Sequence, residues 1–174
     1  MGILGAIIYN FKNMKKAKKL RLIGKEGLLA LEDEEFYDAI ECICEDAVYD
    51  INDTSINDES KTVYSLLKFE AEVNNGGLCQ FFVNSSSECA PYLSKALSAV
   101  GAQDLKTLFD NFIAENHIDV NDLSIFKISD VDEYEEKIEL FDFDQFDDQF
   151  YENEDFHQQI INFAKKNIDK LIAE

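Results

Sequence analysis

Several residue types are scarce in this sequence. It has no tryptophan, one proline and seven glycines, too few turn residues for an all-β protein, which needs many. No apolar run reaches the roughly 18 residues that cross a membrane. The apolar start precedes a basic run, which is the reverse of a secretory signal. We therefore expect an all-α protein that stays in the cytoplasm.

The four cysteines do not have the spacing of a zinc site. Cys42, Cys44, Cys79 and Cys89 give C-x-C and C-x9-C instead of paired C-x2-C, so we expect free thiols. A stretch beginning at Asp50 starts like a calcium loop but lacks its glycine and its final glutamate. The two histidines have no ligand pattern near them, and no nucleophile or nucleotide motif is present. We predict no metal, no cofactor and no catalytic residue.

Charge is distributed unevenly along the chain. The first 25 residues carry seven bases and no acid, and the rest carries 36 acids against nine lysines, a net −27. Small soluble domains usually carry a net charge of about 2–8 in magnitude, and such an excess repels itself. We therefore treat residues 1–25 as a basic amphipathic N-terminal arm and residues 26–174 as an acidic helical domain.

The arm allows two interpretations. Residues 3–22 predict a helix with a stripe formed by Ile3, Ile7, Phe11 and Met14. We favour a helix that packs on its own body and partly neutralises it. The alternative is a helix that lies on anionic lipid or nucleic acid, and contact with a membrane is the less favoured of the two.

Periodic apolar residues predict a single compact domain of six to eight helices with the arm appended. In residues 32–51, Phe36, Ile40, Ile43 and Ala47 share one helical face. A second row of acids runs beside them. Further helices are predicted over residues 58–74, from the serines at 85–87 to Gly101, over 103–115, over 132–151 with a break near Asp142, and over 154–172.

Acids are densest between residues 130 and 155, where thirteen stand against one lysine. Phenylalanines at helical spacing on the same segment direct many of these acids outward. Duplex DNA presents one charge per roughly 1.7 Å, so only two or three acidic helix faces side by side approach it. Composition alone favours a solvated surface without a dedicated partner. The alternative is a partner-binding acidic surface formed by Glu34, Asp38, Glu41, Glu45, Glu133, Glu136, Glu139, Asp142, Asp144, Asp147 and Asp148.

The most specific stretch runs from Glu70 to Asn84. It predicts a helix that stops at Asn-Asn-Gly-Gly, because Asn and Gly tolerate positive φ. Gln80 and Asn84 then follow one helical turn apart. One interpretation is a polar recognition loop. We favour the other, a tight turn whose amides satisfy buried backbone groups.

The stretch E-V-N-N-G-G-L-x-Q-F-F-x-N-S-S resembles the signature of a bacterial domain-of-unknown-function family of acidic helical proteins that includes a DNA mimic. The resemblance covers roughly residues 60–165, including L-x-x-V-G-A at a helix end and, weakly, D-Q-F-Y at 148–151. Leu78 replaces the usual Phe and Phe81 the usual Tyr. The basic arm has no part in the resemblance. The matching residues are Glu72, Asn75, Gly76, Gly77, Gln80 and Asn84.

The resemblance implies an all-helical acidic protein that occupies the DNA-binding face of a transcription factor. We thus expect a non-enzymatic interaction protein whose partner is a basic protein, such as a regulator or a nucleoid protein. The acidic body itself is not expected to bind nucleic acid. Alternatives are an immunity- or antitoxin-like protein that neutralises a basic toxin, an enzyme that uses the Asn75–Asn84 region, and a membrane tether through the arm.

Overall fold

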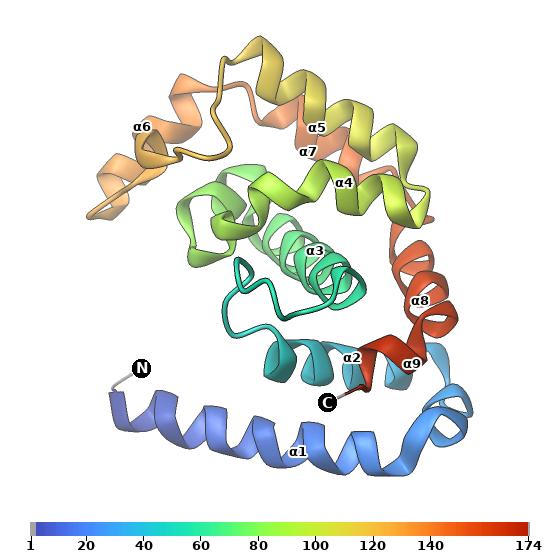
Figure 1. The fold of residues 1–174 in the computed structure, drawn as a ribbon. Helices are drawn as coiled ribbons and strands as arrows, with labels where there is room; N and C mark the ends of the chain where they lie inside the picture. The colour runs from blue at the N-terminus through green and yellow to red at the C-terminus, as the bar shows by residue number, and fades with distance from the viewer. Residues whose placement is uncertain (1–2, 174) are drawn as a thin grey trace. The chain divides into compact units, whose positions relative to one another are not determined.

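A computed structural model describes residues 3–173, with the side chains of residues 3–13 and 131 left out of that description. The predicted stripe of Ile3, Ile7 and Phe11 therefore lies outside the described side chains. Within the described range the chain forms nine α-helices, two short 3-10 helices and no strand. Figure 1 draws their course along the chain. The all-α class is confirmed. Besides the N-terminal helix that contains the predicted arm, the described residues form eight α-helices, which lies within the expected six to eight.

The element bounds follow the predicted ones with a few differences. The predicted helix 32–51 is shorter, because it ends at Ala47. No helix among the described residues combines the length and apolarity that a bilayer crossing requires. The α-helices are α1 (Ile3–Leu29), α2 (Asp33–Ala47), α3 (Asp58–Val83), α4 (Ala90–Val100), α5 (Gln103–Glu115), α6 (Val131–Leu140), α7 (Asp144–Tyr151), α8 (Phe156–Lys166) and α9 (Ile168–Leu171), and the 3-10 helices are η1 (Ser85–Cys89) and η2 (Ser124–Phe126).

The chain divides into two compact units. The terminal unit comprises Met1–Tyr64 and Ile161–Glu174, and the central unit comprises Ser65–Ile160. The division differs from the expected boundary at residue 25, which stays a prediction. Each unit has its own buried apolar residues.

In the terminal unit, α1 packs beside α2 (Figure 1). Gly24, with φ of 69°, interrupts α1 just after the predicted 3–22 helix. Arg21 lies before this interruption and forms an ion pair with Asp46, while its second nitrogen donates to the carbonyl of Ile43 at 3.2 Å. Lys25 pairs with Asp169. Two bases of the segment, Arg21 and Lys25, thus pair with acids of their own unit.

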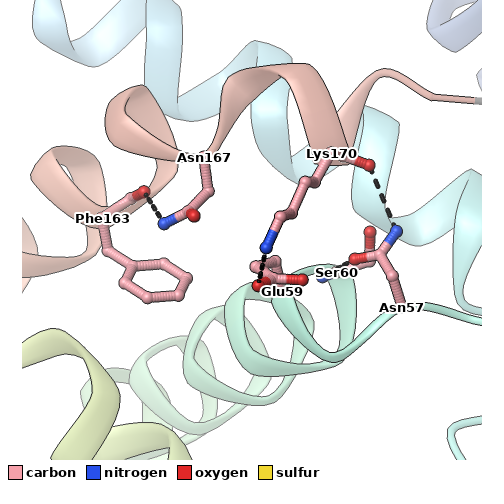
Figure 2. Close-up of polar contacts among 6 residues, drawn as sticks. All are labelled: Asn57, Glu59, Ser60, Phe163, Asn167 and Lys170. Atoms are coloured by element: carbon pink, nitrogen blue, oxygen red, sulfur yellow. Dashed lines mark hydrogen bonds and ion pairs between the residues drawn. The ribbon is translucent and has the colours of Figure 1, made fainter.

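Asn57 joins the start of α3 to the C-terminal end of the chain. Its Oδ1 accepts from the backbone N–H of Ser60 at 2.8 Å, and its Nδ2 donates to the carbonyl of Lys170 at 3.1 Å (Figure 2). The side chain of Lys170 also pairs with Glu59. Asn57 therefore satisfies a free N–H of the first helical turn while it fixes α9 to α3.

Phenylalanine rings fill the core of the central unit. The ring of Phe69 on α3 makes edge contacts with those of Phe81, Phe150 and Phe156 at centroid distances of 5.3, 5.5 and 6.1 Å. Such edge-to-face pairs add to the free energy of area burial by about 0.5–1.5 kcal/mol each. The cluster holds the acid-rich α7 against α3.

The predicted break near Asp142 is confirmed, since α6 ends at Leu140 and α7 begins at Asp144. Phe141 and Phe143, on either side of Asp142, both place their rings near that of Phe126, at 5.1 and 6.4 Å. A continuous helix would separate two residues two positions apart by about 200° around its axis. Packing of both rings against Phe126 therefore requires the break.

The predicted stop at Asn74–Gly77 is confirmed. Gly76 and Gly77 leave the helical conformation, with φ of −166° and 75°, so α3 consists of two helical segments that meet in a sharp bend at these glycines. The second segment, which reaches Val83, begins directly after the bend, where the sequence predicted only a short apolar stretch.

Candidate functional site

Polar side chains of the motif converge on one carboxylate in the central unit. Glu72, on the last turn before the bend in α3, accepts hydrogen bonds on both oxygens. Gln80 Nε2 and Asn84 Nδ2 donate to Oε2 at 2.8 Å each, and the hydroxyl of Ser86 donates to Oε1 at 2.7 Å. Three donors that follow the bend therefore hold the carboxylate of Glu72, which precedes the bend. We call this arrangement the clamp.

This arrangement corrects the role that we favoured for the amides. We expected Gln80 and Asn84 to satisfy buried backbone groups, and they bind the side chain of Glu72 instead. Asn75 is exposed, and the structure does not bring it into the cluster. The cluster also needs Ser86, which sequence reasoning did not single out although it lies in the N-S-S-S run that ends the motif.

The hydrogen bonds change the acidity of Glu72. Burial alone raises the pKa of this carboxyl, but the bonds from Gln80, Ser86 and Asn84 outweigh burial, so the pKa lies below its ordinary value of 4.5. The Glu72 carboxylate is therefore charged at neutral pH, and both of its oxygens already accept hydrogen bonds from side chains of the same protein. It is a structural clamp and a poor general acid or base.

The bend at the two glycines depends on α6 and α7. The carboxylate of Asp147 accepts from the backbone N–H of Leu78 at 2.8 Å, the hydroxyl of Tyr151 donates to the carbonyl of Val73 at 2.7 Å, and that of Tyr134 donates to the carbonyl of Gly76 at 3.3 Å. The backbone groups that the bend frees are thus satisfied by side chains more than fifty positions away.

Asp147 differs from the other acids of the predicted partner surface. It is partly buried, and burial, followed by the nearby charges of Asp144 and Asp148, raises its pKa above the ordinary value even though the N–H of Leu78 opposes this shift. A Cβ on Gly77 would collide with its carboxylate. Asp147 therefore caps the second half of α3, a role that its position in the acidic run did not reveal.

The remaining acids of α7 lie on a helix whose aromatic face is buried, and α6 adds further exposed acids. The rings of Phe143, Phe146 and Phe150 are at most 5% exposed. Glu133 is half-buried and accepts from the backbone N–H of Ser129 at 2.6 Å, so it helps to start α6. The exposed acids of the predicted surface here are Glu136, Glu139, Asp142, Asp144 and Asp148.

A second set of predicted surface acids lies on α2 in the terminal unit. Glu34 and Asp38 are exposed, whereas Glu41 and Glu45 are half-buried. The opposite face of α2 buries Phe36, Ile40 and Ile43 as the periodicity predicted, and Ala47 is half-buried. Each unit thus presents carboxylates from a helix whose other face is apolar and buried.

The thiols do not supply a nucleophile. All four cysteines are free and buried, which agrees with the predicted free thiols. Burial raises the pKa of Cys79 to about 11 and those of Cys44 and Cys89 to about 12. At neutral pH they are protonated, and the thiol form is a weak nucleophile. In the described part of the chain, no three His, Cys, Asp or Glu side chains gather in a way that would hold a metal ion.

The fold and the site define a small acidic all-helical protein whose motif shapes a bent helix. The model of the DMP19-like protein family matches residues 54–167, about two thirds of the 174 residues. The chain therefore belongs to the DMP19-like protein family. The matched range includes the whole motif together with α6 and α7, and it excludes α1 and α2. Comparisons with curated proteins and with solved structures gave no match.

Proposed function

We propose that this protein is an acidic decoy that occupies the basic DNA-binding surface of a regulator or nucleoid protein and keeps DNA off it. The observation that carries the proposal is the pairing of exposed acids with buried phenylalanines on α7. Asp144 and Asp148 are exposed on this helix, whose Phe146 and Phe150 are buried, and Glu139 is exposed on the preceding α6. The family match and the net charge of −20 support the same proposal.

The decoy acts through carboxylates presented in the place of phosphates. The aromatic interior fixes the helices that carry these charges, so little conformational entropy is lost when a partner binds. Long-range attraction between the acidic surface and a basic partner speeds association, and both affinity and rate fall steeply as salt rises. The four buried free thiols fit a reducing compartment, and we include the cytoplasm in the proposal.

The test combines capture with competition. The immobilised protein is incubated with lysate of the source organism at about 50 mM and about 500 mM salt, a range over which phosphate-like contacts weaken by orders of magnitude. Each captured DNA-binding protein is then purified and bound to a fluorescent duplex. We expect the wild-type protein to displace the duplex at low salt and not at high salt.

Matched variants link the competition to the acidic surface. In the first variant Glu139→Gln, Asp144→Asn and Asp148→Asn remove three exposed charges from α6 and α7. In the control variant Asp104→Asn, Asp119→Asn and Asp122→Asn remove three exposed charges elsewhere in the central unit. Displacement should weaken about tenfold or more in the first variant only. Equal loss in both variants, or capture of no DNA-binding protein at low salt, would contradict the proposal.

A further inference from the structure

A hollow of about 320 Å³ lies between α5 and α7 in the central unit. These two helices pack against each other (Figure 1). The floor of the hollow is formed by the buried rings of Phe112 and Phe146. Glu115 and Asp142, both exposed, contribute the charged part of its wall. No lysine, arginine or histidine lines it, so every ionisable group that faces this space from the described chain is a carboxylate.

The amide side chains around the hollow add acceptors to this wall. Asn116 Nδ2 donates to the carbonyl of Phe112 at 2.9 Å, and Gln149 Nε2 donates to the carbonyl of Gln145 at 3.1 Å. In each case the amide nitrogen binds the backbone of its own chain. The side-chain oxygens of Asn116 and Gln149 keep their full capacity to accept hydrogen bonds from a ligand, and each amide nitrogen keeps one of its two N–H donors.

The backbone adds a partial negative charge of its own. Glu115 is the last residue of the 13-residue helix α5, so the C-terminal carbonyls of that helix lie beside the hollow. Helix C-termini favour cations by about 0.3–1 kcal/mol. The first turn of α7 carries the partial positive charge of a helix N-terminus, and the negative charge of Asp144 in that turn offsets it.

We propose that this hollow receives an arginine side chain of the basic partner. The inference rests on the proposed function, because that function supplies a basic partner. An arginine presents five N–H donors and no acceptor, whereas a lysine presents three donors on a compact ammonium group. A wall of two carboxylates and several amide oxygens offers more acceptors than an ammonium can use. The apolar floor accommodates the methylene stem of the arginine.

The hollow makes the acidic surface selective for one kind of cation, which exposed acids alone are not. Exposed carboxylates attract any cation, and exposed ion pairs contribute little, about 0–1 kcal/mol each. A cation that enters a hollow loses water and gains several charge-assisted hydrogen bonds at fixed positions. One arginine of the partner would then become the anchor of the interface, as buried arginines often do.

The direct test uses two small probes of equal charge. The full-length ¹⁵N-labelled protein is titrated with N-acetyl-arginine methylamide and, separately, with N-acetyl-lysine methylamide. We expect the arginine probe to shift the side-chain amide signals of Asn116 and Gln149 and to bind at least about threefold more tightly, which is less than one charge-assisted hydrogen bond is worth. Equal binding of the two probes, or shifts spread evenly over the acidic surface, would overturn the inference.

Variants extend the test to the macromolecular partner. Glu115→Gln removes a charge from the hollow, and Asp104→Asn removes one from the other end of α5. Gln149→Leu removes an acceptor without any change of charge, and Gln103→Leu is its control. All four side chains are exposed. We expect DNA displacement to weaken about tenfold in each hollow variant and to stay unchanged in each control.

The results separate failure of the inference from failure of the proposed function. One outcome contradicts only the arginine site. In it, neutralising Glu139, Asp144 and Asp148 weakens DNA displacement, whereas Glu115→Gln and Gln149→Leu leave it unchanged. The proposed function fails when the wild-type protein displaces no DNA. In that case the probe titration alone decides whether the hollow recognises a guanidinium group.

Discussion

At the residue scale, two glycines with positive φ differ in their ψ angles and in their surroundings. Gly77 has φ of 75° and ψ of −179°, and its missing Cβ would meet the carboxylate of Asp147, whereas Gly101 has φ of 84°, ψ of 11° and open space around it. Gly101→Ala should cost about 1 kcal/mol in the free energy of unfolding, from backbone strain alone. Gly77→Ala should cost about 2–4 kcal/mol, because its backbone region is essentially closed to alanine and overpacking against the carboxylate adds to that strain. Urea denaturation of both variants measures the difference.

Equal losses for the two variants would contradict the close approach of Asp147 to Gly77. The double variant Gly77→Ala, Asp147→Ala provides a control. It removes the carboxylate that the new methyl group would meet, so the two changes together should cost less than the sum of the single changes. Such non-additivity is the signature of two groups in contact.

Glu72 carries a second prediction at this scale. Its pKa is lower in the folded protein than the ordinary value of 4.5, so the clamp contributes stability above that value and loses its contribution as pH falls through the folded pKa. The free energy of unfolding of the wild type minus that of Glu72→Gln should therefore shrink between about pH 6 and pH 3. Urea titrations at each pH give this difference, and a difference that stays constant with pH would refute the clamp.

At the scale of the elements, Asn57 has two separable roles. Asn57→Ala removes both the cap of α3 and the bond to Lys170, and we expect a loss of about 1–2 kcal/mol in the free energy of unfolding. Asn57→Asp keeps an oxygen for the N–H of Ser60 and loses only the donor, so it should cost less. If the aspartate variant were as unstable as the alanine variant, the bond to α9 and not the cap would dominate.

The sequence predicts elements of this fold that depend on local pattern. The spacing of Phe36, Ile40 and Ile43 identifies α2 and its buried face, because these residues recur with the period of a helix. Gly101 ends α4 where the sequence placed it, in a left-handed conformation. Each of these features is fixed by residues within a few positions of one another.

The bend in α3 combines a local signal with distant contacts. Asn-Gly-Gly ends the first helical segment because glycine adopts positive φ without strain, and the sequence predicts this stop. The backbone groups that the bend frees are bound by Asp147 and Tyr151, which lie 69 and 78 positions further along the chain than their partners and which the local pattern does not identify. A weak similarity at D-Q-F-Y pointed to that segment without showing its role. Among Asp144, Asp147 and Asp148, the sequence offers no local sign of which one turns inward.

At the scale of the whole molecule, the dominant quantity is a net charge of −20. Ion pairs such as Lys25–Asp169 are exposed and contribute little to stability. Salt screens the repulsion among the remaining acids, with a Debye length that falls from about 30 Å at 0.01 M to about 3 Å at 1 M. The urea midpoint of the protein should therefore rise between those salt concentrations.

A chloride series measured at constant pH tests this expectation, and choline chloride in place of sodium chloride controls for specific cation binding. A midpoint that fell with salt would mean that ion pairs outweigh the repulsion.

The sequence composition alone predicts the direction of this effect, because net charge does not depend on the fold. It does not predict which acids stay exposed and which turn inward, since that depends on packing around residues such as Phe146 and Phe150.

The clamp on Glu72 also bears on the order in which the chain folds. Its three donors come 8, 12 and 14 positions after it, so the contacts close short loops, and loops of about ten residues close in roughly 10–100 ns. The bend can therefore take its native direction before the residues that later cap it, nearly seventy positions away, have arrived. In kinetic experiments, substitutions at Glu72 should slow refolding, while substitutions at Tyr151 should mainly speed unfolding.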